Sequence, residues 1–103
     1  MGAREDRQKD LLASKVFIRK TRKLFYQHDP IGLRPCPEDE YEPERASICR
    51  RLLKCNGIES VQTMVHKEFV HWFGGRLAGD PQRYEKLSKD LLAFYKTFKK
   101  TGK

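Results

Sequence analysis

The chain has 103 residues, of which 38% are hydrophobic and 35% charged, and its formal net charge at pH 7 is +8. This length allows one domain with one modest core. No apolar run approaches the ~18 residues of a membrane-spanning helix, and the start of the chain lacks the apolar stretch of a signal peptide, so we expect a cytoplasmic protein. The cysteines Cys36, Cys49 and Cys55 form no Cys-x-x-Cys pair, which indicates reduced thiols.

The first predicted helix covers residues 9–27, after a polar start at 1–8 that we expect to fray. Apolar or small side chains recur there every three or four residues, the spacing of a helix with one buried face. This set is Leu11, Ser14, Phe17, Ile18, Thr21, Leu24 and Phe25. His28 stands next to Asp29-Pro30, a context that disfavours further helix, so the helix should end there.

A proline-rich stretch from His28 to Tyr41 follows and holds three of the five prolines. Asp29, Pro30 and Gly32 fit the first, second and fourth positions of a type I turn. The two later prolines stiffen the backbone and remove amide donors. We therefore expect an ordered loop that is not helical.

Three further helices are predicted, at 42–56, 60–73 and 81–99. Pro43 and Pro81 suit the first helical position, Ser60 can cap the third helix, and glycines follow the second and third. The fold class is therefore all-α: a small four-helix, bundle-like domain spanning 1–103, with 100–103 frayed and the ordered acidic loop between helices 1 and 2. The predicted core is Ile18, Phe25, Leu52, Val65, Phe69, Trp72, Leu87, Leu91 and Phe94.

Charge is segregated along the chain. Residues 29–44 contain one basic and six acidic residues, whereas the rest of the chain sums to +13. A helix N-terminus favours nearby acids but does not require so many. We predict a partner-binding surface made of Asp29, Glu38, Asp39, Glu40 and Tyr41. The rival interpretation is that these acids neutralise basic groups of the same fold, such as Arg19 or Arg22.

The candidates for catalysis and metal binding are weak. His66 and His71 are five residues apart, whereas the zinc-protease helix needs its histidines four apart to reach one metal. Cys36 is the most exposed thiol expected, and nothing in the sequence supplies it with an activating base other than nearby His28. We predict no catalytic residue, no metal site and no cofactor, hence no enzyme.

The segments His28-Asp29-Pro30-Ile31-Gly32-Leu33, Pro37-Glu38-Asp39-Glu40-Tyr41-Glu42 and Trp72-Phe73-Gly74 carry a resemblance. The chain resembles a family of short, uncharacterised bacterial all-helical proteins with a DPIG and a PEDEY motif, over roughly residues 15–95. The resemblance implies a helical cytoplasmic protein of bacterial origin and loosely an immunity or regulatory partner, and it implies no catalytic residue. This chain is more basic than the members of that family.

The leading functional hypothesis is a non-enzymatic protein-interaction module, with another protein as its partner and no membrane. It uses the acidic loop and the adjoining basic faces, and an immunity or regulatory role would fit it. The alternative is weak, non-specific nucleic-acid binding through basic helix faces, and a hydrolase or metal-dependent activity comes third. Ordinary solvated lysines also explain such a charge layout. The nucleic-acid alternative rests on Lys15, Arg19, Arg22, Lys89, Lys96 and Lys100.

Overall fold

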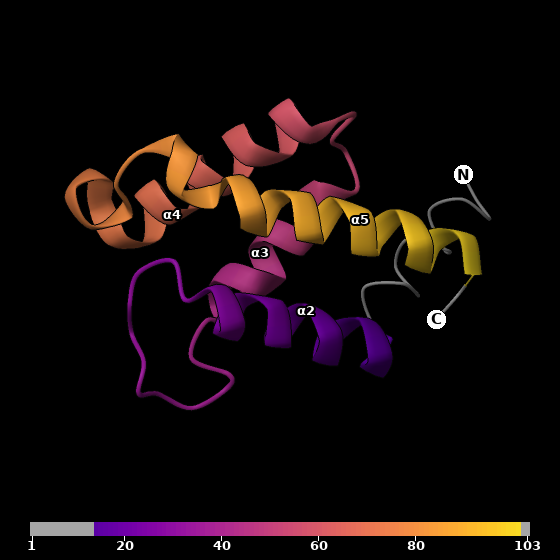
Figure 1. The fold of residues 1–103 in the computed structure, drawn as a ribbon, viewed down its shortest axis with the longest axis horizontal. Coiled ribbons are helices and arrows are strands. Elements are labelled where there is room, and N and C mark those ends of the chain that lie inside the picture. The colour runs from indigo at the N-terminus through magenta and orange to yellow at the C-terminus, as the bar shows by residue number, and fades with distance from the viewer. Residues whose placement is uncertain (1–13, 102–103) are drawn as a thin grey trace.

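The computed structural model describes residues 14–101, which form four α-helices and no strand (Figure 1). These helices are α2 (Lys15–His28), α3 (Glu42–Leu52), α4 (Ile58–Ala78) and α5 (Glu85–Thr101), and a short 3-10 helix, η1 (Pro81–Tyr84), precedes α5. The predicted all-α, bundle-like fold is confirmed. The ends at 1–8 and 100–103 were expected to fray, but Lys100 and Thr101 belong to α5. Residues 1–8 and 102–103, and the predicted helical residues 9–13, lie outside the described part.

The start of α2 differs from the prediction, which placed Ser14 inside the helix. Ser14 has extended backbone angles, and its Oγ accepts a hydrogen bond of 3.3 Å from the Phe17 amide. A serine oxygen that satisfies a free amide of the first turn is an N-cap. Ser14 therefore precedes the helix and does not belong to its buried face.

The end of α2 and the turn after it follow the prediction closely. The helix ends at His28, and Asp29 takes a left-handed conformation with φ of 45° while its amide still bonds to the Phe25 carbonyl at 2.9 Å. The Gly32 amide then bonds to the Asp29 carbonyl at 3.0 Å, which closes the predicted four-residue turn.

The α3 helix ends at Leu52, earlier than the predicted residue 56. The amides of Lys54 and Cys55 bond to carbonyls three residues back, those of Arg51 and Leu52, at 3.0 and 3.1 Å. Such tighter bonds replace the α-helical pattern in a last turn. The spacing of apolar residues continues through this turn, so periodicity alone does not reveal the change.

The α4 helix starts at Ile58 and contains a break at Gly74. Gly57 is its N-cap, and Ser60, the predicted cap, instead accepts a hydrogen bond of 3.1 Å from the Asn56 amide. Gly74 has φ of 84° and ψ of 157°, a conformation that glycine adopts without steric cost. The regular helix thus stops where predicted, and a further turn leads from the break to Ala78.

The core is built around the ring of Phe69 in α4. Its centroid lies 6.2 Å from that of Phe25 in α2, 6.1 Å from that of Tyr41 at the end of the loop and 5.0 Å from that of Tyr84 in η1. Aromatic rings at such distances contribute beyond their buried area. Phe69 therefore joins three segments that are far apart in sequence.

Most of the predicted core is confirmed, and three residues deviate. Phe25, Leu52, Val65, Phe69, Leu87 and Leu91 are buried. Ile18 and Phe94 are only partly buried, and Trp72 has 44% of its surface exposed. Trp72 is in the last turn before the Gly74 break, where it shares an edge contact with His71 at 5.7 Å.

Helices α2 and α5 lie side by side and run in opposite directions (Figure 1). Phe17 of α2 stacks on Phe94 of α5 at 5.6 Å and meets Phe98 edge-on at 5.4 Å. At the other end, His28 Nε2 lies 2.7 Å from Asp90 Oδ2. These contacts fix the distance between the two helices.

Candidate functional site

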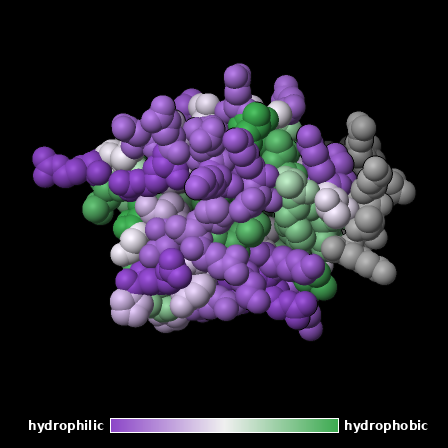
Figure 2. Space-filling view, viewed as in Figure 1, coloured by the Kyte–Doolittle hydropathy of each residue, from purple (hydrophilic) through white to green (hydrophobic). Residues whose placement is uncertain are grey.

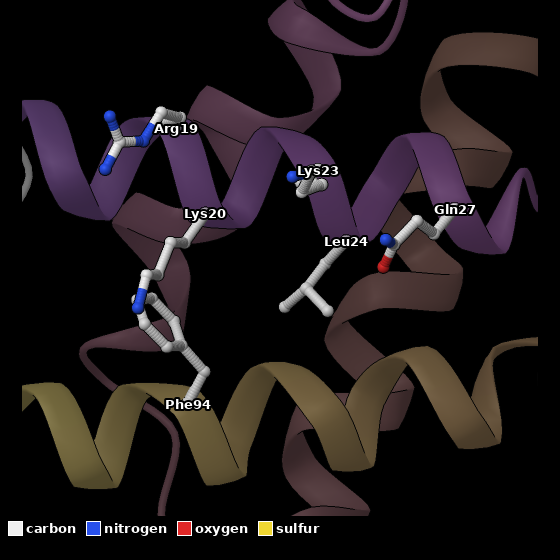
Figure 3. A pocket seen from close by; sticks show the side chains of 6 residues that line it. All are labelled: Arg19, Lys20, Lys23, Leu24, Gln27 and Phe94. Atoms are coloured by element: carbon white, nitrogen blue, oxygen red, sulfur yellow. The ribbon is translucent and has the colours of Figure 1, made fainter.

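A groove lies between α2 and α5 and has a volume of about 590 Å³. It is lined by Arg19, Lys20, Lys23, Leu24, Gln27 and Phe94. Figure 2 shows apolar surface between these two helices with hydrophilic surface around it. In Figure 3, Leu24 and Gln27 point toward the gap, and Lys20 reaches from α2 to the Phe94 ring.

The lining follows from the periodicity of α2. Lys20, Leu24 and Gln27 are four and three residues apart, so they lie on one helix face. Arg19 and Lys23 lie one position earlier at each turn and border the same face. Phe94 is held against Phe17, so only part of its ring covers the core and the rest forms the floor of the groove.

The electrostatics of α2 are one-sided. Between Lys15 and His28 the helix contains no aspartate or glutamate. His28, at the end of the helix, lies 2.7 Å from Asp90 Oδ2, and of the lysines and arginines Arg22 alone forms an ion pair, 3.0 Å from Glu42 Oε1. The other four have no ion pair among residues 14–101: Lys15, Arg19, Lys20 and Lys23. Lys20 Nζ lies 6.0 Å from the centre of the Phe94 ring, at the edge of cation–π range.

Asp29, a predicted surface residue, is mostly internal. Only 10% of its side chain is exposed. Its Oδ1 accepts hydrogen bonds from the Leu33 amide and the Tyr41 hydroxyl, both at 2.7 Å, and its Oδ2 accepts from the Arg34 amide and Nε at 3.2 and 3.3 Å. Burial alone would raise the pKa of Asp29, but these hydrogen bonds outweigh it and lower the pKa.

Tyr41 is also internal, with 1% of its surface exposed. Its hydroxyl accepts a hydrogen bond of 3.1 Å from the Ile31 amide. Burial, and then the hydrogen bond to the Asp29 carboxylate, raise the pKa of Tyr41. Asp29 and Tyr41 therefore hold the loop together from within, and placing them on a shared binding surface was wrong. Glu38, Asp39 and Glu40 are the exposed members of that set.

The three exposed acids, which we call the acidic turn, form no ion pair within the described chain. Hydrogen bonds from the Glu40 amide to the Pro37 carbonyl and from the Glu42 amide to the Asp39 carbonyl shape this turn. The pKa of Arg22 is raised chiefly by its hydrogen bond to Glu42, with smaller contributions from Asp39 and Glu38. Asp39 and Glu38 thus interact weakly with Arg22 and do not pair with it, so the rival interpretation stays a prediction.

Below this turn, Glu42 joins α2 to α3. It receives hydrogen bonds from Arg22 and from buried Arg45, whose Nη2 lies 2.6 Å from Glu42 Oε2. Burial opposes ionisation, but the two guanidinium groups outweigh it and lower the pKa of Glu42. Arg45 also donates to Thr21 Oγ1 at 3.3 Å. Glu42 and Arg45 serve the fold and take no part in the groove.

The predicted basic residues do not form one surface. Arg19 lines the groove, Arg22 is paired with Glu42, and Lys89 is paired with Glu85 at 3.5 Å. Lys15 and Lys96 are exposed; Lys100 belongs to α5, and its side chain lies outside the described part. Lys20 and Lys23 also line the groove and were not among the predicted residues. The pattern of cations at 19, 20 and 23 beside Leu24 was a signal that could have identified them.

The cysteine and histidine candidates do not line the groove. Burial raises the pKa of the Cys49 thiol to about 11, and burial followed by the charges of Asp29 and Glu40 raises that of Cys36, so neither thiol is activated. His66 Nε2 contacts the Gly79 carbonyl at 2.9 Å. Within residues 14–101 there is no metal-binding cluster of three His, Cys, Asp or Glu side chains, and none of the helices there is long and apolar enough to cross a membrane.

Comparison with protein-family models, with curated proteins and with solved structures finds no match to this chain. The resemblance to the bacterial family with the DPIG and PEDEY motifs therefore stays a prediction.

Proposed function

We propose that the chain is a non-enzymatic interaction module that binds an acidic partner protein in the groove between α2 and α5. The observation that carries this proposal is the lining: Arg19, Lys20 and Lys23 border an apolar floor, and no acidic side chain is among the lining residues. Unpaired cations beside apolar surface attract an anionic partner and then offer it area to bury. A neutralising or regulatory subunit would use such a site.

The net charge supports a different protein as the partner. At +8 on 103 residues, two copies of this chain repel each other at a distance, whereas an acidic protein is drawn toward it. The acidic turn, in the loop just before α3, is a proposed second contact for basic groups of the same partner. It does not line the groove.

Nucleic-acid binding is the second candidate, and one observation favours it. An aromatic ring, Phe94, lies among cations, the combination that single-strand binders use for stacking and phosphate contact. The sequence contains no recognisable base-reading motif, so such binding would be weak, tolerant of sequence and sensitive to salt.

The test is affinity capture from the native host, with identification of the retained protein or nucleic acid and with a nuclease-treated parallel sample. The wild-type chain is compared with the double variant Lys20→Glu, Lys23→Glu. A matched control, Lys54→Glu with Lys67→Glu, changes the charge equally at exposed positions outside the groove. We expect one acidic protein to be retained by the wild type and the control, and lost with the groove variant. Retention by all three, or loss of the ligand on nuclease treatment, contradicts the proposal.

A further inference from the structure

The groove combines two chemistries that have to be satisfied together. Leu24 and Phe94 form an apolar floor, and the charged ends of Arg19, Lys20 and Lys23 stand beside it. A purely charged ligand would leave the apolar floor in contact with water and would gain nothing from its burial. A purely apolar ligand would remove water from the cations without replacing it by an anion, which costs free energy.

We infer that the groove binds an acidic, amphipathic helical segment of the partner, which inserts one apolar side chain over Leu24 and Phe94 and places carboxylates on the cations of α2. This inference rests on the proposed function and specifies its partner. The volume of about 590 Å³ lies in the range of ~300–1,000 Å³ typical of ligand sites, enough for an inserted side chain and its flanking carboxylates.

The spacing of the cations favours a helix as the bound segment. Arg19 and Lys23 are four residues apart in α2, a rise of ~6 Å. Acidic residues at i and i+4 of a facing helix have the same spacing, and an apolar residue at i+3 or i+7 lies on the same face. Gln27, one turn beyond Lys23, presents a neutral amide to the end of the segment.

The surroundings of Phe94 favour a peptide over a nucleic acid. Phe17 stacks on this ring at 5.6 Å, and Lys20 Nζ lies over it at 6.0 Å. A base needs a whole ring face for stacking, so it would have to displace one of these contacts. An aliphatic side chain of the bound segment needs to contact only Leu24 and the accessible part of the ring. A carboxylate next to it on the same segment can accept a hydrogen bond from the Lys20 ammonium group.

The experiment measures binding of fluorescent probes to the full chain by anisotropy at low and moderate salt. The first probe is an acidic amphipathic peptide of about 15 residues, long enough to form helix on binding. The second has its apolar anchor residues replaced by serine, the third is oligoglutamate of equal charge, and the fourth is oligothymidylate. Changing the probe tests the apolar floor without any effect on the folding of the protein.

We expect the amphipathic peptide to bind at least about tenfold more tightly than the serine peptide and oligoglutamate, a ratio within reach of one buried side chain. The double variant Lys20→Glu, Lys23→Glu should weaken this binding by about tenfold or more, and Lys54→Glu with Lys67→Glu should not. Binding should also weaken as salt rises.

Three results would overturn the inference: equal binding of oligoglutamate, tighter binding of oligothymidylate, or no binding of the amphipathic peptide. The capture experiment separates these failures from failure of the proposed function. If a protein is captured through Lys20 and Lys23 but the amphipathic peptide does not bind, the site is an interface of another chemistry. If no protein is captured, the proposed function fails as well.

Discussion

The Tyr41 hydroxyl donates a hydrogen bond of 2.7 Å to Asp29 Oδ1 across the loop that separates α2 from α3. The same hydroxyl accepts one from the Ile31 amide, while the Tyr41 ring packs 6.1 Å from Phe69. One side chain thus fastens the loop to the core and organises its polar groups. The stability of the loop and the stability of the core are therefore coupled through Tyr41.

Replacement Tyr41→Phe should lower the free energy of unfolding by about 1–3 kcal/mol, because it leaves the Ile31 amide without a partner and removes one of the two hydrogen bonds to Asp29 Oδ1 in a mostly buried place. Urea denaturation followed by circular dichroism measures this change. Tyr26→Phe is the matched control, since the Tyr26 hydroxyl forms no hydrogen bond within residues 14–101. Equal stability of both variants would show that the hydroxyl of Tyr41 is not a structural group.

The Asp29 carboxylate should make stability depend on pH in the acid range. Its pKa in the folded chain is lower than the ordinary value of 3.8, so its ionised form stabilises the fold above about pH 4, and this contribution is lost as pH falls through the folded pKa. Asp29→Asn removes the charge, and asparagine tolerates the left-handed conformation. The stability difference between wild type and variant should be largest near neutral pH and shrink as the pH falls below the ordinary value of 3.8 and through the lower folded pKa. A difference independent of pH would contradict this role.

Leu91→Ala should cost about 2–5 kcal/mol, since Leu91 is fully buried and truncation leaves a cavity. For a small domain this is a large part of the total stability. Leu77→Ala makes the same change at a residue that is 56% exposed. It should lower the free energy of unfolding by well under 1 kcal/mol. Thermal unfolding of the two variants provides the comparison, and similar melting temperatures would be inconsistent with the described core.

Charge reversal of the acidic turn, Glu38→Lys with Glu40→Lys, should leave the helical signal and the melting temperature nearly unchanged. Both side chains are exposed and unpaired among the described residues, and exposed charges are worth only about 0–1 kcal/mol each. If the turn contacts a partner, association should slow. A large fall in melting temperature with unchanged partner affinity would assign these acids to the fold alone.

The helices and turns could be predicted from the sequence because they depend on residues that are close together in the chain. Proline and glycine positions identified the turn after Asp29 and the break at Gly74, and the regular spacing of apolar residues identified the helices and most of the core. It did not predict that Asp29 and Tyr41 would be internal. Their hydrogen bond joins residues 12 positions apart, and only the packing of α2 against α3 and α4 brings them together.

The groove lay beyond sequence analysis for a related reason. Phe94 and Leu24 both follow the apolar pattern of their helices, so both were expected to face the core. How far a residue at the edge of an apolar face is covered depends on the angle and distance between helices, and Phe17 sets these for α2 and α5. Trp72 was expected to be buried for the same reason, and it is exposed beside the Gly74 break, where the helix ends.

The convergence of aromatic rings on Phe69 has a consequence for how the chain can be divided. Rings from α2, from the loop and from η1 all meet it, so a fragment lacking either end of the chain would leave one side of that ring in water. A local fluctuation that exposes Phe69 must therefore move α2, the loop and η1 away from α4 at the same time. Amide protons in the middle of α4 should consequently exchange only when the whole molecule unfolds, and those of the acidic turn long before.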